Sequence, residues 1–220
     1  MSPPAERLPL FPLAVVLLPG TALPLHIFEP RYRRMVADAL AGSREFGLVY
    51  LPPGWRDDEV PGGWPLTVAR IEEHEPLPDG RSNILVRGMR RVALSAFVAD
   101  DAPYRVGTVT DAPDLPGSGE SLEPLAAQAR QLFARVAAAA RAVADDPAPA
   151  PPLPADAALL AYAIAAAVDL DPEARHRLLA TRDPGERLAL VLGLLTPVAA
   201  DLERRAAVHA RSRTNGHGPH

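Results

Sequence analysis

The sequence predicts an α+β fold, with short strands and one inserted helix in the first half and helices alone in the second. In roughly the first 110 residues, apolar residues occur in short runs separated by proline, glycine and aspartate, which is typical of strands joined by turns. From residue 122 onward the apolar spacing changes to that of a helical stripe. The chain has 220 residues, of which 48% are hydrophobic and 23% charged, as in ordinary soluble proteins.

The apolar runs of the first half predict strands at 8–11, 15–18, 23–27, 46–51, 66–75, 83–98 and 104–110. Pro78-Asp79-Gly80 separates two of these runs and predicts a tight hairpin, because proline presets its φ and glycine tolerates a positive φ. Prolines at 9, 12, 19 and 24 cannot donate ladder hydrogen bonds, so the first strands must be short or lie at edges. We therefore expect a small, irregular barrel.

One helix interrupts the strands. We expect Glu29 to be its N-cap, Pro30 its first residue and Gly42 its left-handed C-cap. The helical spacing places five apolar residues on one face: Tyr32, Met35, Val36, Ala39 and Leu40. Arg31, Arg34 and Asp38 fall on the opposite side, which we interpret as a solvated surface.

The second half predicts a helix along 122–140, further helices at 156–168 and 173–181, and a last one from 185 that Pro197 kinks or breaks. Between them, 145–155 contains too many prolines for a helix or central strand, so we expect an extended loop. We expect a β-rich subdomain at 1–112, a helical subdomain at 113–208 and a disordered tail at 209–220.

The composition excludes several kinds of chemistry. All 23 basic residues are arginine and there is no cysteine, so a Ser-Lys dyad, a Schiff base, a P-loop lysine, a thiol nucleophile and a disulfide are impossible. No serine lies in a G-x-S-x-G elbow, and no G-x-G-x-x-G follows a strand. We therefore predict no catalytic residues and no cofactor, and the missing cysteine fits a cytoplasmic protein.

Charge and hydropathy limit the partners. A net charge of −4 provides no general attraction to nucleic acid, which is therefore not the expected partner. The apolar run at 8–18 could be read as a secretory signal peptide, but its internal prolines and the apolar pattern that continues beyond it favour strands. No apolar run approaches the roughly 20 residues that span a bilayer, so we expect no membrane insertion.

Three groups of residues leave alternatives open. His26, Glu29, Glu72 and His74 could form the metal site of a hydrolase, although their spacing is generic and a structural role is favoured. Six arginines could form an RNA-binding patch, but surface ion pairs are favoured; they are Arg31, Arg33, Arg34, Arg87, Arg90 and Arg91. Trp55 and Trp64 flank a loop rich in glycine, proline and aspartate, where tryptophan either plugs the core or meets a partner.

The segment LPLFPLAVVLLPGTALPLHIFEPRYRRMVADAL at 8–40 strongly resembles the N-terminal, substrate-binding domain of Lon proteases and the stand-alone proteins built from it. FGLVYL at 46–51, LTVARIEEHEPLPDGRSNILVRGMRRV at 66–92 and PYRVGTVT at 103–110 look like later strands of that domain. DLDPEARHRLLATRDPGERLALVLGLL at 169–195 resembles its helical half, so the likeness covers about 7–205. It implies a PUA-like pseudo-barrel followed by a helical bundle.

The resemblance also implies a function: non-catalytic binding of unfolded or extended polypeptide, with a separate protease or ATPase as a further partner. A chain of this length without lysine is not expected to hold the ATPase and protease modules of full Lon. Phe28, Tyr32, Trp55 and Trp64 are the candidate peptide-binding residues. The resemblance assigns a structural role to six others: Pro12, Pro19, Gly20, His26, Glu29 and Pro30. The oligomeric state stays open.

Overall fold

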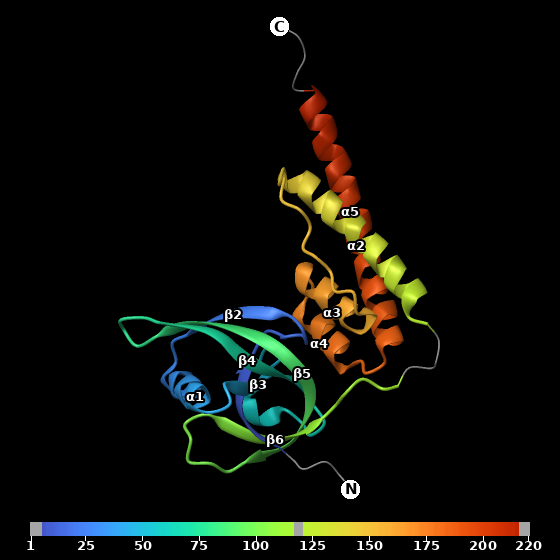
Figure 1. Ribbon diagram of the computed structural model, residues 1–220. Helices are drawn as coiled ribbons and strands as arrows, with labels where there is room; N and C mark the ends of the chain where they lie inside the picture. Colours follow the sequence, from blue (N-terminus) through green and yellow to red (C-terminus); the bar gives the residue numbers. More distant parts are fainter. Residues whose placement is uncertain (1–5, 117–120, 216–220) are drawn as a thin grey trace. The chain divides into compact units, whose positions relative to one another are not determined.

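The computed structural model describes residues 6–116 and 121–215 (Figure 1). They form two compact units, of which the first runs to Leu115 and also takes in Asp169–Arg182. The second unit consists of Pro116–Val168 and the chain from Asp183 onward. The predicted boundary between 112 and 113 had assigned all later helices to one subdomain, whereas the structure groups one of them with the strands.

The first unit is built on a six-stranded sheet in the order β2-β5-β4-β3-β1-β6 (Figure 1). Its strands are β1 (Glu6–Leu13), β2 (Ala22–Ile27), β3 (Glu45–Tyr50), β4 (Pro65–Pro76), β5 (Ser82–Val98) and β6 (Arg105–Asp111). The 17-residue strand β5 also pairs with β6, so the sheet closes on itself and leaves β2 as an outer edge. This closure agrees with the small irregular barrel that the prolines predict.

The prolines of β1 and β2 lie where the strand has a ladder on one side only, so that a backbone N–H can be spared. Pro24 lies in β2, which pairs with β5 alone among the described strands. Strand β1 pairs with β6 through residues 6–10 and with β3 through residues 10–13. Pro9 and Pro12 therefore each lie in a half of β1 that has a ladder on one side only, which is where a missing N–H is tolerated.

The strand predicted at 15–18 is wrong. Val16, Leu17 and Leu18 are buried, but this segment is a loop that crosses the sheet. The Thr67 hydroxyl donates a hydrogen bond to the Leu17 carbonyl at 2.6 Å and holds the loop there. A four-residue apolar run has the same pattern whether it fills the core as a strand or as a loop, so periodicity could not separate the two.

The predicted hairpin is confirmed between β4 and β5. The Leu77 amide donates to the Arg81 carbonyl at 2.8 Å, and the Gly80 amide donates to the Leu77 carbonyl at 3.0 Å. Gly80 has a φ of 81°, as the turn requires. In Figure 1 this hairpin reaches past the neighbouring strands of the first unit.

Helix α1 (Pro30–Ala41) begins at Pro30 as predicted, and its buried face is formed by Tyr32, Met35, Val36 and Ala39, with Leu40 partly buried beside them. Glu29 is its N-cap and Gly42 its C-cap, as predicted, but Gly42 is not left-handed. The Glu29 carbonyl accepts from the Tyr32 and Arg33 amides, whereas the Glu29 side chain makes no capping hydrogen bond and pairs with Arg31 at 3.0 Å. Gly42 has a φ of −118°, and the left-handed residue is instead Arg44, at 63°.

The second unit contains α2 (Glu123–Ala144), α3 (Ala157–Ala167) and α5 (Pro184–Asn215). Helix α5 passes through Pro197 without ending, so of the predicted kink or break, the break does not occur. Leu195 and Ala199, on either side of this proline, are fully buried, and their packing outweighs one lost hydrogen bond. The helix extends over 209–215, which were expected to belong to a disordered tail; residues 216–220 lie outside the described residues.

Helix α4 (Pro172–Ala180) belongs to the first unit. Arg91 of β5 holds its C-terminal end: the guanidinium donates to the carbonyls of Leu179 and Thr181, each at 3.1 Å. The same group donates to the Ala112 carbonyl at 2.8 Å and the Asp114 carboxylate at 2.6 Å. One buried arginine thus fastens two later chain segments to the barrel.

Candidate functional site

The most distinctive surface of the first unit is a stack of four rings, which we call the ring stack: Trp55, Trp64, His176 and Tyr50. The His176 ring of α4 lies against Trp64, with ring centres 4.4 Å apart and planes at 27°, and 5.1 Å from Tyr50. Trp55 continues the stack at 5.5 Å from Trp64. Tyr50 is buried, whereas Trp55 is 41% exposed, so the stack runs from the core to the surface.

The loop at 51–64 positions the exposed end of the stack. Tyr50 ends β3 and Trp64 directly precedes β4, and the Trp64 indole donates to the Tyr50 carbonyl at 3.0 Å. The Trp55 amide donates to the Pro52 carbonyl at 3.1 Å. Arg31 of α1 pairs with Asp57 at 3.1 Å, which ties the loop to the helix. Trp55 is therefore held in place before any ligand arrives.

Burial keeps the His176 imidazole neutral and lowers its pKa from 6.5 to about 4. Its Nδ1 atom is buried without a hydrogen-bond partner. Stacking on Trp64 suits a neutral ring in this position, and protonation would place an unpaired charge between aromatic rings.

This lowered pKa predicts acid sensitivity of the first unit. Because the unfolded state takes up the proton near pH 6.5 and the folded state only near pH 4, the contribution of neutral His176 is complete above pH 6.5 and is lost as the pH falls to 4. Because His176 is partly exposed and solvent screens the effect, we expect the free energy of unfolding to fall by about 2 kcal/mol over this pH range. Urea unfolding at several pH values should show this decline, and His176→Phe should flatten it. An equal flattening by His74→Gln, a control on exposed β4, would contradict the assignment.

The other predicted peptide-binding residues lie elsewhere. Phe28 is 59% exposed and stacks on His26 at 6.2 Å between ring centres. Tyr32 is only 4% exposed and packs on Phe11 at 4.1 Å. Its burial raises the pKa of the phenol to about 12. Tyr32 is thus a core residue, and the structure brings together only Trp55 and Trp64.

The residues proposed for a metal site have other partners. His26 is within 2.8 Å of the Asn83 side chain, Glu29 pairs with Arg31, and Glu72 pairs with Arg87. Over the described part of the chain, no group of three or more histidine, aspartate or glutamate residues could hold a metal ion. The metal-hydrolase hypothesis therefore has no support in this geometry.

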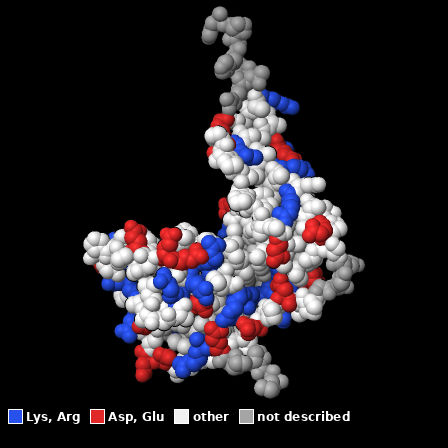
Figure 2. All heavy atoms as spheres, viewed as in Figure 1, with Lys and Arg blue, Asp and Glu red and all other residues white. Residues whose placement is uncertain are grey.

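The arginines proposed for RNA binding are mostly engaged in ion pairs. Arg90 pairs with Glu6 and Asp111, Arg34 pairs with Asp38, and Arg91 is buried. Basic and acidic side chains lie side by side on the face of the first unit that Figure 2 shows. These contacts favour the ion-paired surface over a patch for phosphates.

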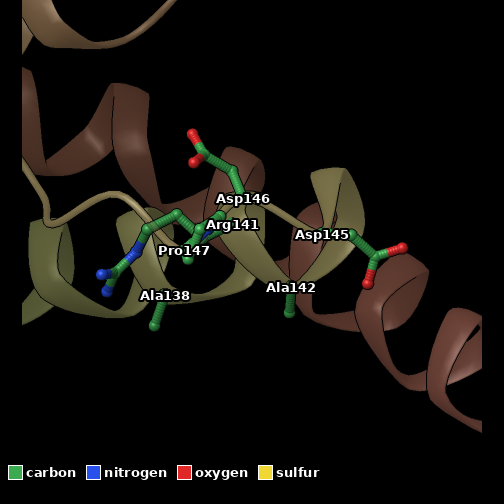
Figure 3. Close-up of a pocket in the computed structure, with 6 residues that line it drawn as sticks. All are labelled: Ala138, Arg141, Ala142, Asp145, Asp146 and Pro147. Atoms are coloured by element: carbon green, nitrogen blue, oxygen red, sulfur yellow. The ribbon is translucent and has the colours of Figure 1, made fainter.

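In the second unit, a hollow lies where α2 ends (Figure 3). It is lined by Ala138, Arg141, Ala142, Asp145, Asp146 and Pro147. The two carboxylates point apart in Figure 3, and Arg141 uses its guanidinium on the carbonyls of Ala137 and Ala148. The hollow therefore shapes the start of the proline-rich loop and offers no convergent polar groups.

Sequence reasoning missed Tyr50 and His176. Tyr50 is the end of an apolar run, and His176 lies among charged residues of a short helix, as in ARHRLL. No spacing relates them, because the two rings meet only through the fold. Within the described residues, no helix has the length and apolar character needed to cross a membrane.

The first unit is thus a β-rich domain whose sheet closes on itself and which takes in one helix from the second half of the chain. The sequence model of one protein family, the ATP-dependent protease La (LON) substrate-binding domain, matches residues 7–197. The chain belongs to this family. The resemblance seen in the sequence is thereby confirmed.

Several relatives share this domain. The Lon protease of Roseiflexus castenholzii is 30% identical over 192 residues, which are 86% of this chain and 24% of that protein. The Lon protease of Xanthomonas oryzae is 28% identical over 199 residues, 88% of this chain and 23% of that protein. The chain therefore spans about a quarter of the length of the curated relatives it matches.

Solved structures show the same fold. The crystal structure of a Lon N-terminal domain protein from Xanthomonas campestris has a TM-score of 0.60 and 28% identity, and the match covers 86% of this chain and 98% of that one. The N-terminal domain of a Mycobacterium avium complex Lon protease has a TM-score of 0.64, with 89% and 99% covered. At 20% identity the latter supports the fold alone.

Proposed function

We propose that this protein binds unfolded or extended polypeptide without transforming it, through a PUA-like barrel whose exposed contact is the outer end of the ring stack. The family's substrate-binding role supports this function. The observation that carries it is Trp55, a large aromatic side chain that is 41% exposed on a loop fixed by its own hydrogen bonds. Large exposed aromatic side chains dominate binding at protein interfaces.

The chemistry of the chain fits binding better than catalysis. Lysine and cysteine are absent from the sequence, and the half-buried histidine of the ring stack is neutral at physiological pH. We place the protein in the cytoplasm, with a separate protease or ATPase as a partner that would act on the bound polypeptide. Phe28, exposed beside β2, is the second candidate contact.

Substitution of Trp55 tests this function. Trp55→Ala is expected to weaken binding of a permanently unfolded, fluorescein-labelled client by about tenfold, because it removes a preformed aromatic contact. Phe28→Ala should weaken binding by a smaller factor. Fluorescence anisotropy against purified protein measures both effects.

Val208→Ala provides the matched control, since Val208 is 62% exposed on α5. It should leave the affinity unchanged. Equal affinity of the wild-type protein and Trp55→Ala for the client would contradict the role of the ring stack. Failure of the wild-type protein to bind any unfolded client would contradict the proposed function itself.

A further inference from the structure

Trp55 has a hydrogen-bonding group that its own fold leaves unused. The indole N–H of Trp64 is committed to the Tyr50 carbonyl, but among the hydrogen bonds of the described residues none involves the Trp55 indole. The ring is exposed on a fixed loop, so an apolar face and a free donor are presented together. Aromatic grooves that recognise polyproline II segments combine these two features, since prolyl rings stack on the aromatic face and the unpaired backbone carbonyls accept hydrogen bonds.

The second unit carries a segment of the matching chemistry, residues 148–154, which we call the proline segment. Its sequence is APAPPLP, in which every residue either is a proline or directly precedes one. Proline fixes its own φ near −65° and drives the preceding residue away from the helical region. The segment is therefore confined to extended, polyproline II-like backbone and forms neither helix nor strand.

The proline segment is presented rather than packed away within its own unit. Pro149, Pro151 and Pro152 are exposed. Arg141 donates to the Ala148 carbonyl at 3.3 Å, and Arg130 donates to the Pro154 carbonyl at 2.7 Å, so both ends are fixed to α2. A ligand held in its bound conformation loses little entropy when it docks.

We propose that the proline segment of one molecule docks on Trp55 of a second copy. The occupant follows from complementarity within the chain: a preformed aromatic surface with a free donor, and an exposed segment restricted to the conformation that such surfaces bind. The contact joins two different patches, so it is heterologous and can form a reciprocal pair or a growing chain. This inference rests on the proposed function, because it uses the same ring stack.

A complementation experiment tests the docking. Sedimentation velocity of the full chain at concentrations up to about 1 mM should show reversible association, with a contact in the weak range usual for a single aromatic site. Trp55→Ala alone should abolish it. A triple variant, Pro149→Ser with Pro151→Ser and Pro152→Ser, should also abolish it while retaining the wild-type circular dichroism spectrum. A mixture of the two variants should associate, because one supplies the proline segment and the other supplies Trp55.

A wild-type chain that stays monomeric throughout, or a mixture that does not associate, would overturn the docking. Association that survives in either variant alone would also overturn it, since another surface would then be responsible. Binding of the unfolded client is measured separately, with a client sequence that contains no proline. If that client binds and the copies do not associate, the proposed function stands and only this inference fails.

Discussion

Replacing Arg91 by methionine is expected to lower the free energy of unfolding of the first unit by about 3–5 kcal/mol. The substitution keeps the length of the side chain but removes every donor. It removes the guanidinium that binds the Asp114 carboxylate and the carbonyls of Ala112, Leu179 and Thr181 at 2.6–3.1 Å. Arg91 is only 6% exposed, so water cannot readily replace it. Urea unfolding followed by tryptophan fluorescence measures the loss.

The neighbouring Arg90 provides the control. It pairs with Glu6 and Asp111 on the surface, where an ion pair contributes at most about 1 kcal/mol. Arg90→Met should therefore have a small effect that shrinks further in high salt. If the two variants were equally stable, Arg91 could not be the residue that fastens α4 to the barrel.

The contrast between these two arginines shows what the sequence could predict. Val92 and Leu94 line the barrel core, so Arg91 points to the opposite face of β5, which the strands alone would leave in water. Residues 112–114 and 179–181 cover that face, about 20 and 90 residues further along the chain. A pattern within one strand contains no information about a segment that arrives so much later.

Local chemistry was the predictable part of the fold. The Pro78-Asp79-Gly80 hairpin and the start of α1 at Pro30 depend on a few adjacent residues, and both are confirmed. The candidate site was only half predictable for the same reason. Trp55 and Trp64 stand out in the sequence, but the histidine that supports them comes from α4 and reaches them through the fold.

A second long-range contact forms where the 14–21 loop crosses closely over β5. The Gly20 amide donates to the Gly88 carbonyl at 2.8 Å, and the Gly88 amide donates to the Thr21 carbonyl at 2.9 Å. Gly20 has a φ of 80° as it turns the chain after Pro19. These bonds bring the loop backbone so near to β5 that a Cβ on Gly88 would lie 2.3 Å from the Leu18 carbonyl oxygen.

Gly88→Ala is therefore expected to lower the free energy of unfolding by about 3 kcal/mol or more, because the added methyl group meets backbone that hydrogen bonds hold in place. Gly47→Ala is the matched comparison: its Cβ would lie 2.8 Å from the ends of the Leu10 and Leu66 side chains, which can rotate away. It should cost about 1–2 kcal/mol. Gly62→Ala, at 3.4 Å from its nearest neighbour, should be close to neutral. Urea midpoints that fall from Gly62→Ala to Gly47→Ala to Gly88→Ala would confirm that the crossing requires a residue without a side chain at position 88. A Gly88→Ala protein as stable as Gly62→Ala would refute it.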